Sequence, residues 1–167
     1  PATVQVTVNP ASGPPPPTSS LSISNLTVAS GKSYTVPSSG LQSGGTVYID
    51  RTYSFTTVPT GLQGAAYIRT ANNDKAATNA AFLSFTVNQP VSVYVAHDIR
   101  ISPKPSWLST FTDTGKDLVT SVDTLHLFVR DFPAGNITLG GNSGSSNPGN
   151  ELSMYSVVVQ PQGGSAP

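Results

Sequence analysis

The sequence contains no cysteine, which excludes disulfide bonds, thiolate catalysis and zinc sites built on cysteine. Charge is also scarce, because charged residues make up 10% of the chain and eight Lys and Arg balance eight Asp and Glu. Nucleic acids and anionic membranes both require a basic face, which this neutral chain lacks. No apolar run reaches the roughly 18 residues of a membrane-spanning helix. We therefore expect neither nucleic acid nor a membrane as a partner.

Helical periodicity is equally sparse, and the best short helix candidate covers residues 74–81. Short segments that alternate apolar and polar residues are instead separated by turn residues, chiefly glycine, proline, serine and asparagine. This spacing predicts an all-β fold, an antiparallel β-sandwich or jelly roll. The expected strands cover residues 21–28, 32–36, 46–50, 65–69, 81–87, 91–97, 125–129, 135–139 and 153–159.

The ends of the chain differ in composition from its middle. Residues 1–9 alternate like one strand, which is either the closing strand of a preceding domain or an edge strand of the main one. Residues 10–20 contain four successive prolines and are typical of an extended linker. We expect the sandwich to cover residues 21–160 and a second linker to cover residues 161–167. Linkers on both sides predict covalently linked neighbouring domains.

Catalytic patterns are few. No Gly-x-Ser-x-Gly elbow is present, and His97 and Asp98 face opposite sides of a strand, which does not suit a base and the acid that orients it. Glu151 and seven aspartates are a poor supply for a glycosidase, which requires two carboxylates in a cleft. We therefore expect no catalytic residue. A lyase that uses His97, Arg100 and a tyrosine is the enzymatic alternative.

Metal-ligand patterns are similarly weak. The two histidines, His97 and His126, have no ligand-like spacing, so we expect no metal site and no cofactor. A structural calcium ion is the alternative, because two groups of side chains offer oxygen ligands. The first group is Asn72, Asn73 and Asp74, and the second is Asp113, Asp117 and Asp123. Alternatively, the side chains of the first group only make turn hydrogen bonds to the nearby backbone.

Residues 91–107 concentrate the scarce residue types. An alternating strand runs into His97, Asp98 and Arg100 and then reaches Trp107, the only tryptophan, in a Pro-Lys-Pro-Ser setting. Aromatic rings stack on the apolar faces of sugars, while planar polar groups bind the hydroxyls, and arginine also suits carboxylates or sulfates. The candidate carbohydrate-binding residues are Tyr67, Arg69, Asn72, Asn73, Asp74, Lys75, His97, Asp98, Arg100 and Trp107.

Structural roles compete with these assignments. A single tryptophan beside Leu108 also suits a core position rather than a binding platform. Asp98 and Arg100 lie two residues apart and face the same side of an extended strand, so an ion pair that orders the loop is their alternative role. Exposure of the Trp107 ring distinguishes a sugar site from a packed corner of the sandwich.

Six motifs together resemble accessory β-sandwich domains of secreted bacterial polysaccharide-degrading enzymes, particularly polysaccharide lyases and related hydrolases. They are Val93-Tyr-Val-Ala-His-Asp-Ile-Arg100, Pro105-Ser-Trp-Leu108, Phe111-Thr-Asp-Thr-Gly115, Arg130-Asp-Phe-Pro-Ala-Gly135, Thr138-Leu-Gly-Gly-Asn142 and Met154-Tyr-Ser-Val-Val-Val159. The resemblance covers residues 21–160 and implies a jelly-roll module with a carbohydrate-binding or enzyme-supporting role. It transfers no ligand residue to this sequence.

We therefore expect a non-catalytic, extracellular carbohydrate-binding-type module whose partner is a polysaccharide or oligosaccharide. It would anchor a secreted multidomain enzyme to its polymer. The main alternative is a structural spacer or an adhesin or filament domain of a cell-surface protein.

Overall fold

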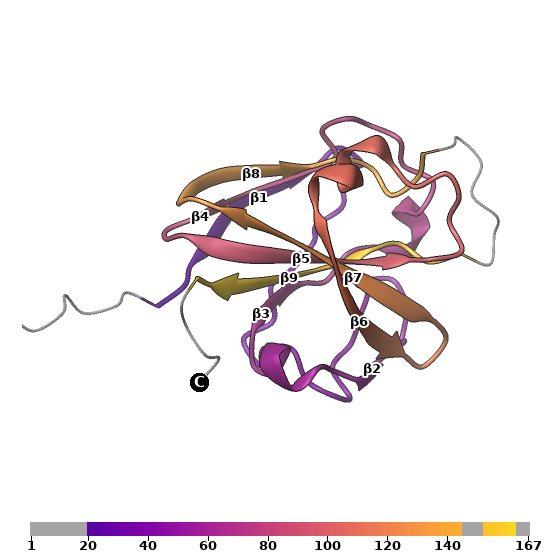
Figure 1. Ribbon diagram of the computed structural model, residues 1–167, viewed down its shortest axis with the longest axis horizontal. Helices are drawn as coiled ribbons and strands as arrows, with labels where there is room; N and C mark the ends of the chain where they lie inside the picture. Colours follow the sequence, from indigo (N-terminus) through magenta and orange to yellow (C-terminus); the bar gives the residue numbers. More distant parts are fainter. Residues whose placement is uncertain (1–19, 145–151, 163–167) are drawn as a thin grey trace, which may run out of the picture.

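Two antiparallel sheets form the protein in a computed structural model that describes residues 20–144 and 152–162. The smaller sheet has the order β1 (Ile23–Val28), β4 (Leu83–Val87), β8 (Gly135–Leu139). The larger has the order β2 (Phe55–Thr57), β6 (Thr112–Thr120), β7 (Thr124–Phe132), β5 (Val91–Asp98), β9 (Ser156–Pro161), β3 (Ala66–Ile68). Figure 1 shows the smaller sheet lying over β5 and β9. No helix in the described part of the chain has the length and apolar character needed to cross a membrane.

Alternating residues of β5 contribute to the core between the two sheets. Val91, Val93 and Val95 point to one side of the sheet and are fully buried. They belong to one apolar cluster with Phe85 of β4 and Ile137 of β8, which are also buried. The two sheets therefore share a sandwich core, which confirms the predicted all-β antiparallel fold.

The larger sheet also curls, so that its two edge strands approach each other. Phe55 of β2 and Tyr67 of β3 make an edge-to-face contact with their ring centroids 5.4 Å apart. A short link that contains the 3₁₀ helix η1 (Thr60–Leu62) joins the two strands. Curling encloses the second face of the sheet, and Val157 and Val158 of β9 are therefore both fully buried although they point to opposite sides.

Some expected elements differ from the structure. Residues 32–36 and 46–50 form isolated bridges rather than strands, including Thr35 with Arg69 and Thr46 with Ser54. The expected helix at 74–81 is replaced by a single 3₁₀ turn, η2 (Asn72–Asp74).

The end segments lie largely outside the described residues. The predicted strand at 1–9 and nearly all of the predicted linker at 10–20 fall outside, and the described part of the chain begins at Ser20. At the other end β9 runs to Pro161, one residue beyond the expected limit of the sandwich.

Candidate functional site

A cradle of side chains holds residues 153–155, the extended segment that leads into β9. All six backbone N–H and C=O groups of this segment hydrogen-bond to side chains. Its three N–H groups donate to Asp98 Oδ2 at 2.9 Å, Asn72 Oδ1 at 3.0 Å and Asn142 Oδ1 at 2.9 Å. Its three carbonyls accept bonds from Asn142 Nδ2 at 3.1 Å, the Tyr48 hydroxyl at 2.7 Å and Thr70 Oγ1 at 2.9 Å. Two of the predicted ligand residues, Asn72 and Asp98, therefore serve this cradle.

Asp98 and Arg100 form an ion pair, the structural role that the sequence offered as the alternative to sugar binding. Arg100 donates from Nε to Asp98 Oδ1 at 2.9 Å and from a terminal nitrogen to Oδ2 at 2.6 Å, and it also pairs with Asp123. Burial opposes ionisation of Asp98, but the bonds from Arg100 and the Ser153 N–H outweigh it and lower the pKa of the carboxyl. Asp98 is therefore a charged, fully buried group whose acceptor positions are occupied.

His97 lies in the same interior region, on the opposite side of β5 from Asp98. Its Nε2 lies 2.8 Å from the carbonyl oxygen of Asn142, and the side chain has no exposed surface. Burial lowers the pKa of His97, so the ring is neutral and Nε2–H donates to that carbonyl. A base that abstracts a proton from a polymer must be accessible, so this position gives the lyase alternative no support.

Asp74 is the centre of a second buried cluster. Its carboxylate accepts hydrogen bonds from Ser30 Oγ at 2.8 Å and from the Tyr34 hydroxyl at 2.8 Å, and it forms an ion pair with Lys32. Burial and the neighbouring Asp74 charge raise the pKa of Tyr34. The cluster fastens the segment after β1 to η2, so the carboxylate of Asp74 is fully engaged.

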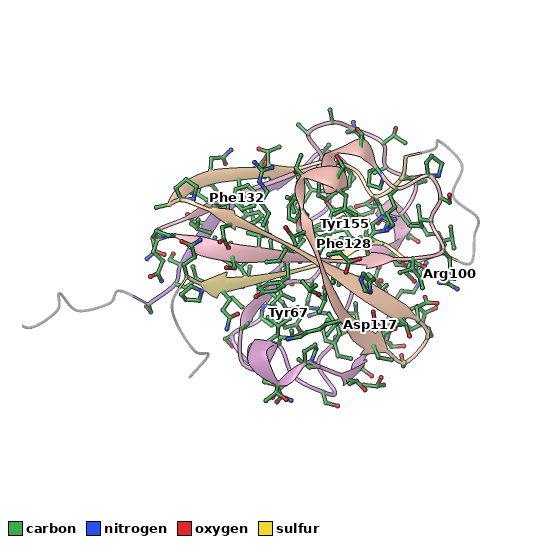
Figure 2. The ribbon with its side chains drawn as sticks, in the orientation of Figure 1. Tyr67, Arg100, Asp117, Phe128, Phe132 and Tyr155 are labelled. Atoms are coloured by element: carbon green, nitrogen blue, oxygen red, sulfur yellow. The ribbon has the colours of Figure 1, made fainter. Side chains whose placement is uncertain are left out.

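The remaining predicted residues are also engaged with the protein. Asn73 is exposed and accepts a bond of 2.6 Å from Arg51, Arg69 donates to the Tyr48 carbonyl at 3.0 Å, and Lys75 presents its carbonyl to Asn142 Nδ2 at 3.0 Å. The Tyr67 ring is buried inside the curled sheet, as Figure 2 shows, and its hydroxyl bonds to a backbone carbonyl. The structure thus distributes the ten predicted residues among separate clusters.

Trp107 lies at a different place, on the 3₁₀ helix η3 (Ser106–Thr110), and is half-buried. Its Nε1 donates to the Gly141 carbonyl at 2.9 Å. Edge-to-face contacts with Phe111 and Tyr155, at centroid distances of 5.6 and 5.8 Å, hold the indole from two further sides. The ring is therefore both a packed corner and a surface element with one fixed orientation.

A hollow of about 450 Å³ opens beside Trp107, at the junction of three loops. Its lining residues are Thr78, Asn79, Ala80, Pro103, Lys104, Pro105, Ser106, Trp107, Gly141, Ser143 and Gly144. An aromatic ring, two prolines and several hydroxyl and amide groups are a typical lining for a small polar ligand with apolar faces. We refer to this site as the Trp107 hollow.

Close packing makes the Trp107 hollow rigid. A Cβ added to Gly140 would lie 2.3 Å from Trp107 Cδ1, and one added to Gly141 would lie 2.3 Å from the Ala77 carbonyl oxygen. A Cβ on Gly144 would lie 2.6 Å from the carbonyl oxygen of Pro103. Each of the three loops therefore touches another without room for a side chain, and the hollow is preformed.

A polar trio lies on the same side of β7 as Phe128. The ring nitrogens of His126 lie 2.6 Å from the carboxylates of Asp113 and Asp117, which bracket a bulge in β6. Burial lowers the pKa of His126, but its hydrogen bonds to the carboxylates of Asp113 and Asp117, together with their negative charges, outweigh burial and raise the pKa overall. Within the described residues, no group of three His, Cys, Asp or Glu side chains has an arrangement that would hold a metal ion.

Sequence reasoning included only Trp107 among the lining residues of the hollow, and it missed Thr78, Asn79 and Lys104 among the others. Lys104 lay in the Pro-Lys-Pro-Ser run that drew attention to Trp107, so its position was a usable signal. Thr78 and Asn79 gave no signal, because they join the hollow only through the backbone bonds that Ala77 and Asn79 accept from Ser143 and Gly141.

Comparison with known proteins shows similarity to segments of much longer enzymes. No protein-family model matches the chain. It is 31% identical over 115 residues to a β-glucuronidase of Formosa agariphila, a stretch that covers 68% of this chain and 12% of that protein. The solved structure of a β-glucuronidase from glycoside hydrolase family 2 superposes with a TM-score of 0.76 at 26% identity, covering 83% of this chain and 14% of the other.

A second structure, of a GH138 enzyme targeting pectin rhamnogalacturonan II, superposes with a TM-score of 0.51 at 15% identity. It covers 83% of this chain and 16% of the other, and at this identity the likeness concerns the fold alone. The chain is thus similar to a segment that makes up about an eighth of much longer enzymes.

Proposed function

We propose that this chain is a non-catalytic carbohydrate-binding module that holds a larger secreted polysaccharide-degrading enzyme on its polymer. The observation that carries this proposal is the Trp107 hollow, in which a fixed indole forms one wall and polar side chains form the others. The candidate sugar-binding residues are therefore those that line this hollow and not the ten predicted from the sequence, and Trp107 is the one residue common to both sets.

The chemistry of the lining fits a sugar ring. The indole of Trp107 offers an apolar surface to the C–H groups of a pyranose, while the amide of Asn79 and the hydroxyl of Ser106 offer donors and acceptors to its hydroxyl groups. Asn79 and Ser106 are exposed, so their polar groups are accessible to a ligand. Because the loops are already closely packed, binding costs little ordering of the protein.

Similarity to β-glucuronidases supports the enzymatic context. This chain matches only 12% and 14% of those enzymes, as an accessory module would. The function of such a module is proximity, because attachment to the polymer raises the local concentration of the catalytic part without any chemistry by the module.

Affinity electrophoresis in gels that contain plant, algal or microbial polysaccharides tests the proposal. We expect retardation of the wild-type protein and weaker retardation of an Asn79→Ala, Ser106→Ala double variant, whose lost side chains have exposed positions. Asn136→Ala, at an exposed position on β8 outside the hollow, is the matched control and should migrate like the wild type. Migration unaffected by every polysaccharide would refute the proposal.

A structural spacer is the second candidate, and the cradle around residues 153–155 favours it. The backbone of this segment forms hydrogen bonds with the side chains of Asn72, Asp98 and Asn142. These bonds strengthen the fold without forming a binding surface. The spacer hypothesis predicts an unretarded protein whose stability, rather than its migration, responds to substitutions.

A further inference from the structure

We propose that the Trp107 hollow selects sugars that carry a carboxylate or a sulfate group, through the ammonium group of Lys104; this inference rests on the proposed function. Among the residues described as lining the hollow, Lys104 is the one that carries a charge, and none is acidic. An anionic substituent placed there therefore meets a cation without an opposing carboxylate in the wall.

The ammonium group has a defined position. Lys104 Nζ lies 4.7 Å from the ring centroid of Phe128, a cation–π contact that restrains a side chain otherwise free to move. Phe128 is itself fixed, because it is 6% exposed and lies within β7, where it pairs with Val95 of β5. The ammonium group of Lys104, a residue that lines the hollow, is thus restrained before any ligand arrives.

The backbone of Lys104 is held as well. The Gly144 Cα approaches the carbonyls of Pro103 and Lys104 so closely that an added Cβ would lie 2.6 and 2.8 Å from their oxygens. Pro103 and Pro105 on either side of Lys104 fix two further backbone torsions. A ligand therefore does not have to order this loop.

Lys104 also remains available for an anion. None of the ion pairs formed by the described residues includes Lys104, whereas Lys32 and Arg100 are each paired with aspartates. Asp113 is close enough for the charge of Lys104 to act on its carboxylate, but its ion pair is with His126 at 2.6 Å. Lys104 is exposed, so an anion in the hollow or in the solvent can approach its positive charge.

An ammonium group is a compact positive charge without the fork geometry of arginine, so it can pair with either a carboxylate or a sulfate group. The two sources are a uronic acid and a sulfate ester. Isothermal titration with three polymers distinguishes them: polygalacturonate, the same polymer after reduction of its carboxyl groups to hydroxymethyl groups, and that neutral polymer after sulfation.

We expect the wild-type protein to bind at least one anionic polymer about three- to fivefold more tightly than the neutral one, the range of a partly exposed charge pair. Lys104→Gln should abolish this preference and Lys104→Arg should retain it. Lys116→Gln removes the same charge from an exposed position in β6 and should leave the preference unchanged.

Equal affinity for neutral and anionic polymers, or an unchanged preference in Lys104→Gln, overturns the inference while the proposed carbohydrate binding stands. Absence of binding to all three polymers and to every neutral polysaccharide overturns both. Preference for only the carboxylated or only the sulfated polymer identifies the source of the charge and supports the inference.

Discussion

Replacement of Asn142 with alanine tests whether buried hydrogen bonds hold the segment that leads into β9. The Asn142 side chain accepts a bond from the Tyr155 N–H and donates to the carbonyls of Ser153 and Lys75, and the residue is fully buried. Alanine leaves these three backbone groups without their partner. An unsatisfied buried polar group costs about 1–3 kcal/mol, so we expect a loss of about 3–5 kcal/mol in the free energy of unfolding.

Asn88 offers a matched control, because its side chain also bonds two backbone groups, the Ser22 N–H at 2.8 Å and the Ser20 carbonyl at 3.0 Å. These groups are exposed, so water replaces the lost amide and Asn88→Ala should cost less than about 1 kcal/mol. Urea denaturation followed by circular dichroism measures both variants. Equal losses for the two variants would refute the reasoning, since burial is the difference between the two sites.

Three further outcomes follow from the geometry. Gly140→Ala should displace the ring of Trp107, shift the fluorescence of this single tryptophan and destabilise the fold, whereas Gly61→Ala, with no atom within 4 Å of its added Cβ, should do neither. The pKa of His126 should lie above 6.5 by NMR titration, and the stability supplied by its protonated form should be present below pH 6.5 and be lost as the pH rises through the raised value. The lowered pKa of Asp98 predicts the opposite dependence: the stability that its charged form supplies is present above pH 3.8 and is lost as the pH falls through the lowered value. Acid denaturation of the wild type and of the Asp98→Asn variant measures this difference.

Alternation in the sequence predicted the buried strands well. Residues 135–139 match β8 without any shift, and residues 91–97 match β5 to within one residue, because apolar side chains face a core there. β6 was missed, since its sequence Thr-Asp-Thr-Gly-Lys-Asp begins with exposed polar residues and contains a bulge at Gly115, where φ is 65°. Such a segment resembles a turn when neighbouring strands are unknown.

The site was harder to predict than the fold, for a physical reason. Polar residues on a strand indicate a solvent-facing side only if one face of the sheet is open, and the curled sheet encloses both faces around β5 and β9. His97 and Asp98 are therefore both buried although they point in opposite directions. The hydrogen-bond partners that offset the cost of burying these polar groups are Asn142 and Ser153, which are distant in the sequence. No local sequence pattern predicts these partners.

The position of β9 determines when the protein can fold during synthesis. Among the described strands β9 is made last, yet it lies between β5 and β3 in the larger sheet. Until β9 has been synthesised, β3 and one edge of β5 lack the strand that pairs with them, although β5 can already pair with β7. The larger sheet therefore stays open until the end of synthesis, and the addition of β9 joins β5 to β3 and buries its valines on both faces of the sheet.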